Sequence, residues 1–263
     1  MARNSLKSVC RLIDVANTQL PVEQSFLADL KRSIELVSEK EVRKPSQTYK
    51  PSSMNCIRNM YYQRIGADGD PYRASYCSVG ICNSGSDIHI RIQTAVENMK
   101  ECGIDCEYID VAEYVKSRNL DYLEIVSKHG METKLFHKDL HMSFLCDGII
   151  RYKGQYYILE IKTETSFKWN NRTSVDPSHY RQGTAYSVAF GLPKVIFVYV
   201  NRDMLDMKSF MFIPTNEMKE DLVGTIEDCE GYVQRLVCPP KPDDVSKKTC
   251  EYCGYKTRCR KDG

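Results

Sequence analysis

Hydrophobic residues near the N-terminus recur three or four positions apart, which is the spacing of one face of an α-helix. In residues 25–40 this face consists of Phe26, Leu27, Leu30, Ile34 and Leu36 or Val37. A polar stretch with two prolines, residues 43–53, follows and is typical of a linker. We therefore expect residues 1–52 to be a helical segment and a linker that precede the main domain.

Turn residues divide the next part of the chain into further helices and strands. Hydrophobic runs at residues 194–201 and 208–214 predict strands, because they are rich in aromatic and β-branched residues. The predicted helices are one that ends at Gly66, one at about residues 85–101 before Gly103, one from the N-cap Asp176 and Pro177 to Gly191, and an amphipathic one at residues 216–237. This order of elements predicts a mixed α/β fold.

The stretch LCDGIIRYKGQYYILEIKTE has the pattern of a β-hairpin. Lys153 and Gly154 suit a two-residue turn, since such turns favour glycine in the second place. With this turn, the numbers of paired residues add up to 307, so Asp147 lies opposite Glu160 and shares its face. Lys162 lies two residues beyond Glu160 and therefore points to the same face. The register thus brings two carboxylates and an ammonium group together.

Two carboxylates that face each other repel, so this arrangement needs a compensating charge. A divalent cation such as Mg²⁺ binds carboxylate and phosphate oxygens together. Lys162 would then position a water or stabilise charge that develops on a phosphate. The alternative is an ordinary exposed hairpin, in which charged and apolar residues simply alternate. The hairpin sequence alone leaves both interpretations open.

Composition limits the classes of protein to which the chain can belong. With 263 residues, 42% of them hydrophobic, it is long enough for one large domain. Its net charge of +2 neither requires nor excludes nucleic acid, so a DNA-binding surface would be a local basic patch. The sequence has no signal-peptide pattern and no apolar run of the roughly 18 residues that a membrane span needs. We expect a soluble protein in the cytoplasm of a prokaryotic or phage-infected cell.

The chain has twelve cysteines, a high number for its length. Cys250, Cys253 and Cys259 lie close together near the C-terminus. Thiolates at this spacing are typical of a metal centre, which needs four ligands to close a tetrahedral zinc site or to hold a [4Fe–4S] cluster. Cys238 would be a nearby fourth ligand and Cys56 a distant one.

Three motifs carry a resemblance to known nucleases. Asp147, with Glu160-x-Lys162 after it, matches the D…(D/E)-x-K signature of the PD-(D/E)XK nucleases. The segment GSDIHIRIQ, with His89, resembles the glycine-x-x-x-histidine helix of their RecB-like branch, and QGTAY resembles its Q-x-x-x-Y motif. The resemblance implies a restriction-endonuclease-like fold, in which helices flank a mixed central sheet.

The same resemblance implies roles for individual residues. The implied ligands of one or two Mg²⁺ or Mn²⁺ ions are His89, Asp147, Glu160 and the main-chain carbonyl of Ile161. Lys162 would position the attacking water. Gln182 and Tyr186 lie four residues apart and so share a helical face, which in the family supports the active site.

The cysteines add a more specific resemblance. Some RecB-like nucleases carry one cysteine before the nuclease core and a C-x2-C-x5-C group after it; they include CRISPR-adaptation nucleases and the AddB subunit of recombination helicase–nucleases. The matching cysteines here are Cys56, Cys250, Cys253 and Cys259. The resemblance implies that they hold a [4Fe–4S] cluster. Cys56 lies at the start of a nuclease core at residues 53–237, the other three cysteines lie in a tail at residues 238–263, and the cluster joins these two parts. Zn²⁺ at the same cysteines is the alternative.

A loop after the hairpin, residues 166–174, combines basic residues with the only tryptophan of the chain. Lys168 and Arg172 would contact phosphates, and Trp169 would stack on an unpaired base. The alternative is an ordinary polar loop with a packed tryptophan.

These observations together predict a metal-dependent DNA nuclease, an exonuclease acting on single strands or duplex ends in repair, recombination, replication or foreign-DNA processing. The expected partners are DNA and a helicase, recombinase or integrase, and an oligomer is compatible with the sequence. A CRISPR-adaptation nuclease that trims DNA beside an integrase is one alternative. A non-catalytic DNA-binding scaffold with a zinc clasp is another.

Overall fold

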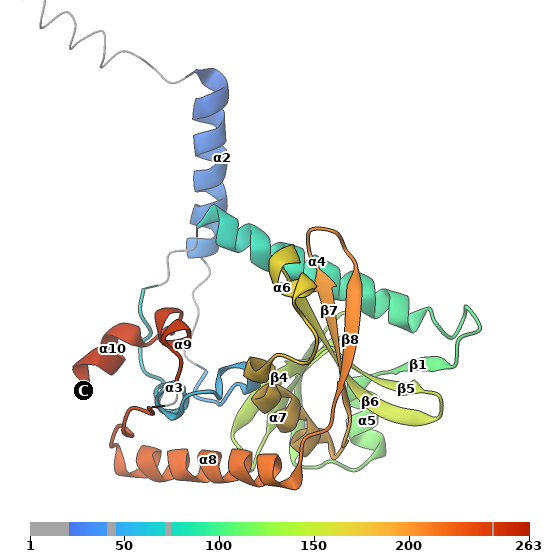
Figure 1. Cartoon of the computed structure of the whole chain (residues 1–263). Helices are drawn as coiled ribbons and strands as arrows, with labels where there is room; N and C mark the ends of the chain where they lie inside the picture. Colours follow the sequence, from blue (N-terminus) through green and yellow to red (C-terminus); the bar gives the residue numbers. More distant parts are fainter. Residues whose placement is uncertain (1–20, 41–45, 72–74, 244) are drawn as a thin grey trace, which may run out of the picture. The chain divides into compact units, whose positions relative to one another are not determined.

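The computed structural model describes residues 21–40, 46–71, 75–243 and 245–263, which belong to two compact units (Figure 1). The first unit contains helix α2 (Val22–Glu39), where the sequence predicts a helix, and the first turns of helix α4 (Tyr76–Glu97). Within this unit, the Glu35 carboxylate accepts a hydrogen bond of 3.2 Å from the main-chain N–H of Tyr76. The predicted N-terminal segment also covers residues 1–20 and 41–45, which lie outside the described residues.

The second unit is built on a five-stranded sheet in the order β1-β5-β6-β7-β8. Its strands are β1 (Cys106–Ile109), β5 (Gly148–Tyr152), β6 (Gln155–Glu164), β7 (Val195–Asn201) and β8 (Met207–Phe212). Strands β6 and β7 are parallel, and the other neighbours are antiparallel. The expected mixed central sheet is therefore confirmed, and β7 and β8 lie where hydrophobic runs predict strands.

Helices pack on both faces of this sheet, as expected for the predicted fold (Figure 1). Ile88 of α4 shares one hydrophobic cluster with Ile161 of β6, and Ala189 of α7 shares the other with Phe197 of β7. The remaining elements are α3 (Ile57–Arg64), α5 (Val111–Ser117), α6 (Ser166–Asn170), α7 (Tyr180–Phe190), α8 (Asn216–Arg235), α9 (Lys247–Glu251), α10 (Lys256–Lys261) and the 3₁₀ turns η1 (Pro51–Ser53) and η2 (Pro177–His179).

Two of the predicted helices differ from expectation at their ends. Helix α4 starts at Tyr76, earlier than predicted, because adding residues to an established helix costs far less than nucleating one, even for glycine and serine. The helix expected from Asp176 onwards begins as the 3₁₀ turn η2, which Asp176 caps by accepting a hydrogen bond from the N–H of Ser178. Helix α7 follows and ends at Gly191, whose φ of 65° is left-handed, as a helix-terminating glycine requires.

A second sheet, which the sequence analysis does not predict, has three antiparallel strands. They are β2 (Leu123–His129), β3 (Glu132–His137) and β4 (Met142–Cys146), in this order. A single residue, Asp147, separates the end of β4 from the start of β5. Asp147 therefore lies at the junction of the two sheets.

The hairpin of β5 and β6 has the register that the sequence predicts. Gly148 pairs with Leu159 and Tyr152 pairs with Gln155, so the numbers of paired residues add up to 307. Lys153 and Gly154 form the turn with φ values of 49° and 77°, both positive, as in a type I′ turn. A continuation of this register beyond Gly148 and Leu159 would bring Asp147 opposite Glu160.

Residues 46–53, the described part of the predicted linker, belong to the second unit and contribute to its core. Tyr49 is completely buried. Its main-chain N–H donates to the carbonyl of His141, its carbonyl accepts from the N–H of Ser143, and its hydroxyl donates to Glu230. A single buried aromatic residue thus fixes a segment whose polar composition is typical of a linker.

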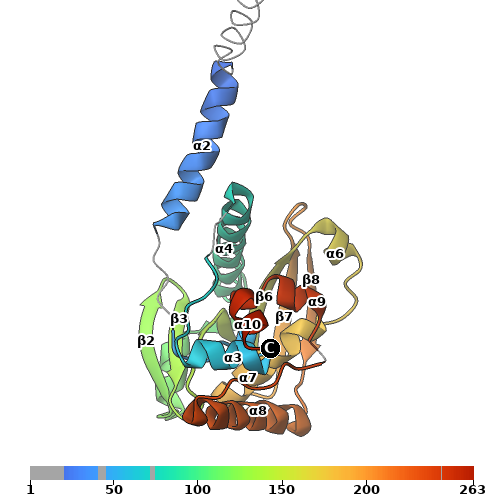
Figure 2. The ribbon, with the colours of Figure 1, turned by 90° about the vertical axis from the view of Figure 1, so that its left-hand side faces the viewer.

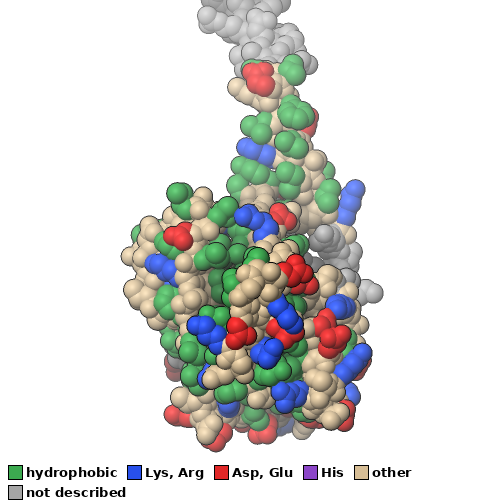
Figure 3. Space-filling view, turned by 90° about the vertical axis from the view of Figure 1, so that its right-hand side faces the viewer, with side chains coloured by type: hydrophobic (Ala, Val, Ile, Leu, Met, Phe, Trp, Pro, Cys, Tyr) green, Lys and Arg blue, Asp and Glu red, His purple; other side chains and the backbone are tan. Residues whose placement is uncertain are grey.

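The surface carries mixed charges. On the face shown in Figure 3, lysine and arginine side chains are interspersed with acidic ones among hydrophobic patches. This distribution agrees with the small net charge of +2. None of the helices in the described ranges is long and apolar enough to cross a membrane.

Candidate active site and cysteine cluster

Asp147 is held at the sheet junction by three groups from different elements. Its Oδ2 accepts a hydrogen bond of 2.6 Å from the main-chain N–H of Ile161. Its main-chain carbonyl accepts from the Gln93 amide at 2.7 Å and from the Tyr108 hydroxyl at 3.2 Å. Asp147 is only 7% exposed, so these contacts fix both its backbone and its carboxylate.

Glu160 is the second carboxylate of the predicted pair and is 3% exposed. Its Oε1 accepts hydrogen bonds from Lys162 at 2.7 Å and from the Gln182 amide at 2.6 Å. Its Oε2 is buried and has no hydrogen-bond partner among the residues that the structure describes. Burial and the neighbouring Asp147 raise the pKa of Glu160 to about 7, although Lys162 and His89 oppose the shift.

Lys162, Gln182 and Tyr186 form one hydrogen-bonded chain beside Glu160. The Lys162 ammonium donates to Gln182 Oε1 at 2.8 Å, in addition to Glu160. The Gln182 amide donates to the Tyr186 hydroxyl at 2.9 Å, and this hydroxyl donates to the carbonyl of Leu145 at 2.8 Å. Gln182 and Tyr186 lie one turn apart on α7, so the helix links Lys162 to the strand that leads to Asp147.

His89 reaches the same place from α4. Its Nδ1 lies 3.0 Å from Oδ1 of Asp147. Burial alone would lower the pKa of His89, but the hydrogen bond and the charge of Asp147 outweigh it, so the pKa is raised. The structure therefore brings His89, Asp147, Glu160, Lys162, Gln182 and Tyr186 together, as the sequence motifs predict; Ile161 contributes its N–H, and the role of its carbonyl stays a prediction.

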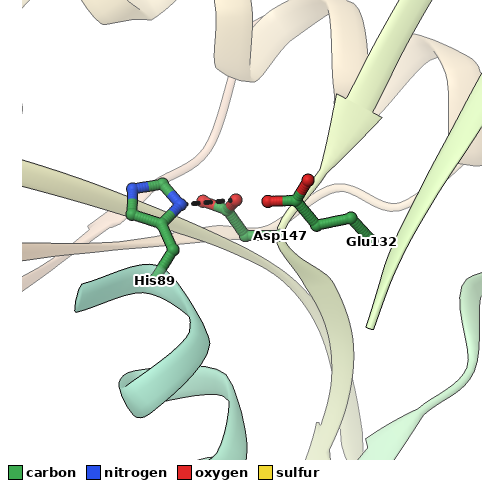
Figure 4. A group of neighbouring side chains, drawn as sticks. All are labelled: His89, Glu132 and Asp147. Atoms are coloured by element: carbon green, nitrogen blue, oxygen red, sulfur yellow. Dashed lines mark hydrogen bonds and ion pairs between the residues drawn. The ribbon is translucent and has the colours of Figure 1, made fainter. Parts of the chain in front are cut away.

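Glu132 at the start of β3 is part of this site, although the sequence analysis does not single it out. One ligand atom each from His89, Glu132 and Asp147 lies within 4.8 Å of the other two (Figure 4). Figure 4 shows the carboxylates of Glu132 and Asp147 turned toward each other, with His89 on the far side of Asp147. Hydrophobic and polar residues alternate on both sides of Gly130. This pattern predicts a β-hairpin with its turn near Gly130, so that Glu132 lies at the start of the second strand.

The site has the properties of a divalent-cation site. Carboxylate oxygens and an imidazole nitrogen are suitable ligands for Mg²⁺ or Mn²⁺. The buried, unpartnered Oε2 of Glu160 is costly unless a positive group satisfies it. The raised pKa of Glu160 is due first to burial and then to the nearby Asp147 carboxylate, and a bound cation would oppose both effects. The residues present therefore fit a bound cation.

A cavity of about 740 Å³ opens beside Glu160. The loop before α3 forms one wall with Thr48 and Lys50, and the second sheet forms another with Lys134 and Ser143. Gln182 and Tyr186 also line it, so the cavity adjoins the hydrogen-bonded chain that holds Lys162. Both lysines are exposed, which leaves their ammonium groups available to a ligand.

The loop predicted to bind DNA makes several structural contacts. Arg172 forms ion pairs with Glu164 at 2.5 Å and Asp176 at 2.8 Å. The indole N–H of Trp169 donates to the carbonyl of Tyr199, and the Lys208 ammonium lies 4.2 Å from the centroid of the indole. Lys168 is exposed on α6, as is its neighbour Phe167, which is 80% exposed. A nucleic-acid role for Lys168, Trp169 and Arg172 stays a prediction.

The segments that carry the candidate cluster cysteines lie side by side. Helix α3 is beside α9 and α10 in both ribbon views (Figures 1 and 2). Cys56, Cys250, Cys253 and Cys259 all line one cavity of about 570 Å³. Cys238 contacts the Tyr62 hydroxyl at 3.3 Å and does not line this cavity.

Hydrogen bonds link α3 to the C-terminal tail around these cysteines. Arg58 is 4% exposed and donates to the carbonyls of Pro239 and Cys259 at 2.8 and 3.0 Å, and to the Cys259 sulfur at 3.4 Å. The Asn59 amide donates to the Cys253 sulfur at 3.5 Å. Burial raises the pKa of the Cys56 thiol, and the nearby Cys253 and Cys259 raise it further. The two ends of the domain thus meet at a group of four thiols.

Comparison with known proteins finds only distant similarity. No protein-family model and no curated protein matches the chain. Among solved structures, SSO0001 is 14% identical with a TM-score of 0.45, over 89% of this chain and 96% of that chain. The alkaline exonuclease LHK-Exo from Laribacter hongkongensis is 11% identical with a TM-score of 0.43, over 73% and 92%. LHK-Exo in complex with dAMP gives the same identity and TM-score over 72% and 91%.

Proposed function

We propose that this chain is a metal-dependent DNA nuclease of the PD-(D/E)XK type, of the RecB-like branch, and acts as an exonuclease on single strands or duplex ends. The observation that carries the proposal is the meeting of Asp147, Glu160 and Lys162, two buried carboxylates and an ammonium group, at the junction of two sheets. His89 from α4 completes the group.

The cation would be held by His89, Asp147 and Glu160, with the main-chain carbonyl of Ile161 as the further ligand that the motif implies. When bound, Mg²⁺ or Mn²⁺ supplies Lewis-acid activation of water and of the scissile phosphate. The crowded carboxylates and the unpartnered Oε2 of Glu160 support this assignment.

Lys162 would position the attacking water or a phosphate oxygen. A lysine ammonium has three N–H donors, and two of them are directed to Glu160 and Gln182. Within the described ranges the third has no acceptor, which leaves it available to a water or a phosphate oxygen. Gln182 and Tyr186 act as positioning residues, since they fix Glu160 and Lys162 through a chain that ends on the carbonyl of Leu145.

The substrate strand would lie in the cavity beside Glu160. Lys50 and Lys134 supply positive charge for backbone phosphates, and Thr48 and Ser143 supply hydroxyl donors. The loop with Lys168 would extend this surface.

The four cysteines that line the second cavity would hold a [4Fe–4S] cluster as a structural clasp between α3 and the tail. Zn²⁺ at the same four cysteines is the alternative, and the metal content of the anaerobically purified protein decides between the two. A helicase, recombinase or integrase partner is part of the same proposal.

Nuclease assays of the anaerobically purified chain test the function. Linear single-stranded and duplex DNA, labelled at either end, would be incubated with Mg²⁺ or Mn²⁺, and with a chelator as a control. We expect shortening from an end, no reaction with the chelator, and a loss of at least about 100-fold in Asp147→Asn, since even outer-shell changes at metal sites cost 10–100-fold. Asp228→Asn, on the exposed side of α8, is the matched control. An inactive wild type, or an Asp147→Asn variant as active as wild type, contradicts the proposal.

A further inference from the structure

We propose that Glu132 is a direct ligand of the divalent cation, together with His89 and Asp147. This inference rests on the proposed function, and it extends the metal site to a residue that none of the sequence motifs contains. Glu132 belongs to the second sheet, so the site would draw ligands from both sheets and from α4.

The strand registers place Glu132 opposite Asp147. In the β3–β4 pair, Thr133 lies opposite Cys146, so a continuation of this register would bring Glu132 opposite Asp147. In the β5–β6 pair, the corresponding extension brings Glu160 opposite Asp147. Since directly opposed residues share a face, Asp147 has one glutamate on each side. The junction between the sheets is what makes this double pairing possible.

Tyr108 of β1 holds the two segments together. Its hydroxyl lies 3.1 Å from the carbonyl of Met131 and 3.2 Å from the carbonyl of Asp147. Met131 directly precedes Glu132, so the same hydroxyl fixes the backbone on both sides of the proposed site. Contacts of the backbone therefore place Glu132 beside Asp147.

The Glu132 carboxylate has no other interaction partner within the described part of the chain. No hydrogen bond or ion pair there involves its side chain. The cationic groups nearby are already paired: Lys162 with Glu160 at 2.7 Å, and His89 with Asp147 at 3.0 Å. Two carboxylates that face each other without a cation repel. A divalent cation beside them relieves this repulsion and uses the hard oxygen ligands that it prefers.

A second observation points to a cation at the same place. Glu160, on the other side of Asp147, is 3% exposed and its Oε2 has no partner. A buried carboxylate oxygen without a partner is costly, and a bound cation would satisfy it. A cation bound beside Asp147 would thus account both for this oxygen of Glu160 and for the unpaired carboxylate of Glu132.

Mn²⁺ binding measured by electron paramagnetic resonance tests the inference without any activity assay. We expect Glu132→Gln to weaken Mn²⁺ binding at least about tenfold, the lower end of what changes around metal ligands cost. Glu124→Gln, an exposed glutamate on β2 of the same sheet, is the matched control and should bind as wild type. Glu132→Asp keeps the charge and should give an intermediate affinity, and it replaces the glutamine variant if that one does not fold.

The outcomes separate this inference from the proposed function. If Glu132→Gln binds Mn²⁺ within about twofold of wild type, Glu132 is not a ligand, while cleavage that depends on Asp147 would still support the nuclease. If wild type binds Mn²⁺ through Glu132 but cuts no DNA, the metal site stands and the nuclease does not. A wild type that binds no Mn²⁺ contradicts both.

Discussion

Tyr108 occupies the space that a side chain at position 148 would need. A β-carbon built on Gly148 would lie 2.6 Å from Cε2 of the Tyr108 ring, closer than non-bonded carbons approach. The ring can reach the sheet junction because residue 148 is glycine, and its hydroxyl then fixes the carbonyl of Asp147. This close approach connects the backbone of β5 to the geometry of the candidate metal site.

We predict that Gly148→Ala destabilises the protein and disturbs the site. The added methyl group forces the Tyr108 ring to move, and overpacking of this kind costs about 1–3 kcal/mol of unfolding free energy. Urea unfolding and Mn²⁺ affinity would both be measured. Gly224→Ala is the control, since a β-carbon there meets no atom within 4 Å and alanine favours the interior of α8 by about 0.5–1 kcal/mol. Equal stability of Gly148→Ala and wild type would exclude the tight contact.

The raised pKa of Glu160 predicts a pH-dependent stability in the absence of metal. The unfolded glutamate has its ordinary pKa of 4.5, and the folded one has a pKa of about 7. The unfolded state therefore releases this proton more readily, so the free energy of unfolding falls as the pH rises from about 4.5 to about 7.

Glu160→Gln cannot ionise and should lose this part of the pH dependence. Urea unfolding with a chelator at pH values of about 5 and 8 compares the two proteins. For the wild type, we expect the free energy of unfolding to differ between these pH values by a few kcal/mol at most. Added Mn²⁺ should restore the stability of the wild type at the higher pH, because the cation supplies the missing counter-charge. An unchanged pH profile in the variant would show that Glu160 is not the titrating group.

The hairpin of the candidate site is predictable from the sequence because its determinants are local. A two-residue turn at Lys153 and Gly154 fixes the register, and the register alone brings Asp147 opposite Glu160. Gln182 and His89 followed from a family resemblance. Their contacts with Lys162 and Asp147 depend on helix packing, which no local pattern specifies.

The features that the sequence analysis missed depend on long-range contacts. The pairing of β3 with β4 and the contact of Tyr108 with Met131 bring Glu132 to the site. Neither contact can be predicted from a local sequence pattern. The polar residues around Tyr49 predict a linker because they outnumber the buried residues of this segment, Tyr49 and Pro51. In both places a few specific contacts outweigh the local pattern.

Lys50 and Lys134 should contribute to binding of a nucleic-acid strand. Fluorescence anisotropy with a single-stranded oligonucleotide and a chelator measures binding without cleavage. We expect Lys50→Ala and Lys134→Ala each to weaken binding and to reduce the slope of log affinity against log salt by about 0.7, the value per phosphate contact on single strands. Lys153→Asn, at the opposite end of the β5–β6 hairpin, is the control, because asparagine tolerates its left-handed backbone. Unchanged slopes would place the strand elsewhere.

Cys56 and Cys238 should differ sharply in their effect on the cysteine cluster. In protein purified without air, we expect about four iron and four sulfide ions per chain, as a [4Fe–4S] cluster requires. Cys56→Ser should lose this content and lower the thermal stability, since metal binding contributes to folding. Cys238→Ser should retain both, because Cys238 does not line the cavity. The opposite pattern would assign the fourth ligand to Cys238, and stoichiometric zinc in the anaerobic protein would contradict the iron–sulfur assignment.

The most direct test of the central claim is DNA cleavage by a Lys162→Met variant. Lys162→Met keeps the length and most of the volume of the side chain but removes the ammonium group between Glu160 and Gln182. Wild type, Lys162→Met and the control Lys116→Met, at an exposed lysine of α5, would be compared on end-labelled single-stranded DNA with Mn²⁺, after unfolding curves have shown that all three are folded. We expect Lys162→Met to lose at least about 100-fold in rate, the effect of removing one group that stabilises transition-state charge, while Lys116→Met cleaves at about the wild-type rate. A folded Lys162→Met variant that cleaves DNA at the wild-type rate would contradict a single site made of Asp147, Glu160 and Lys162.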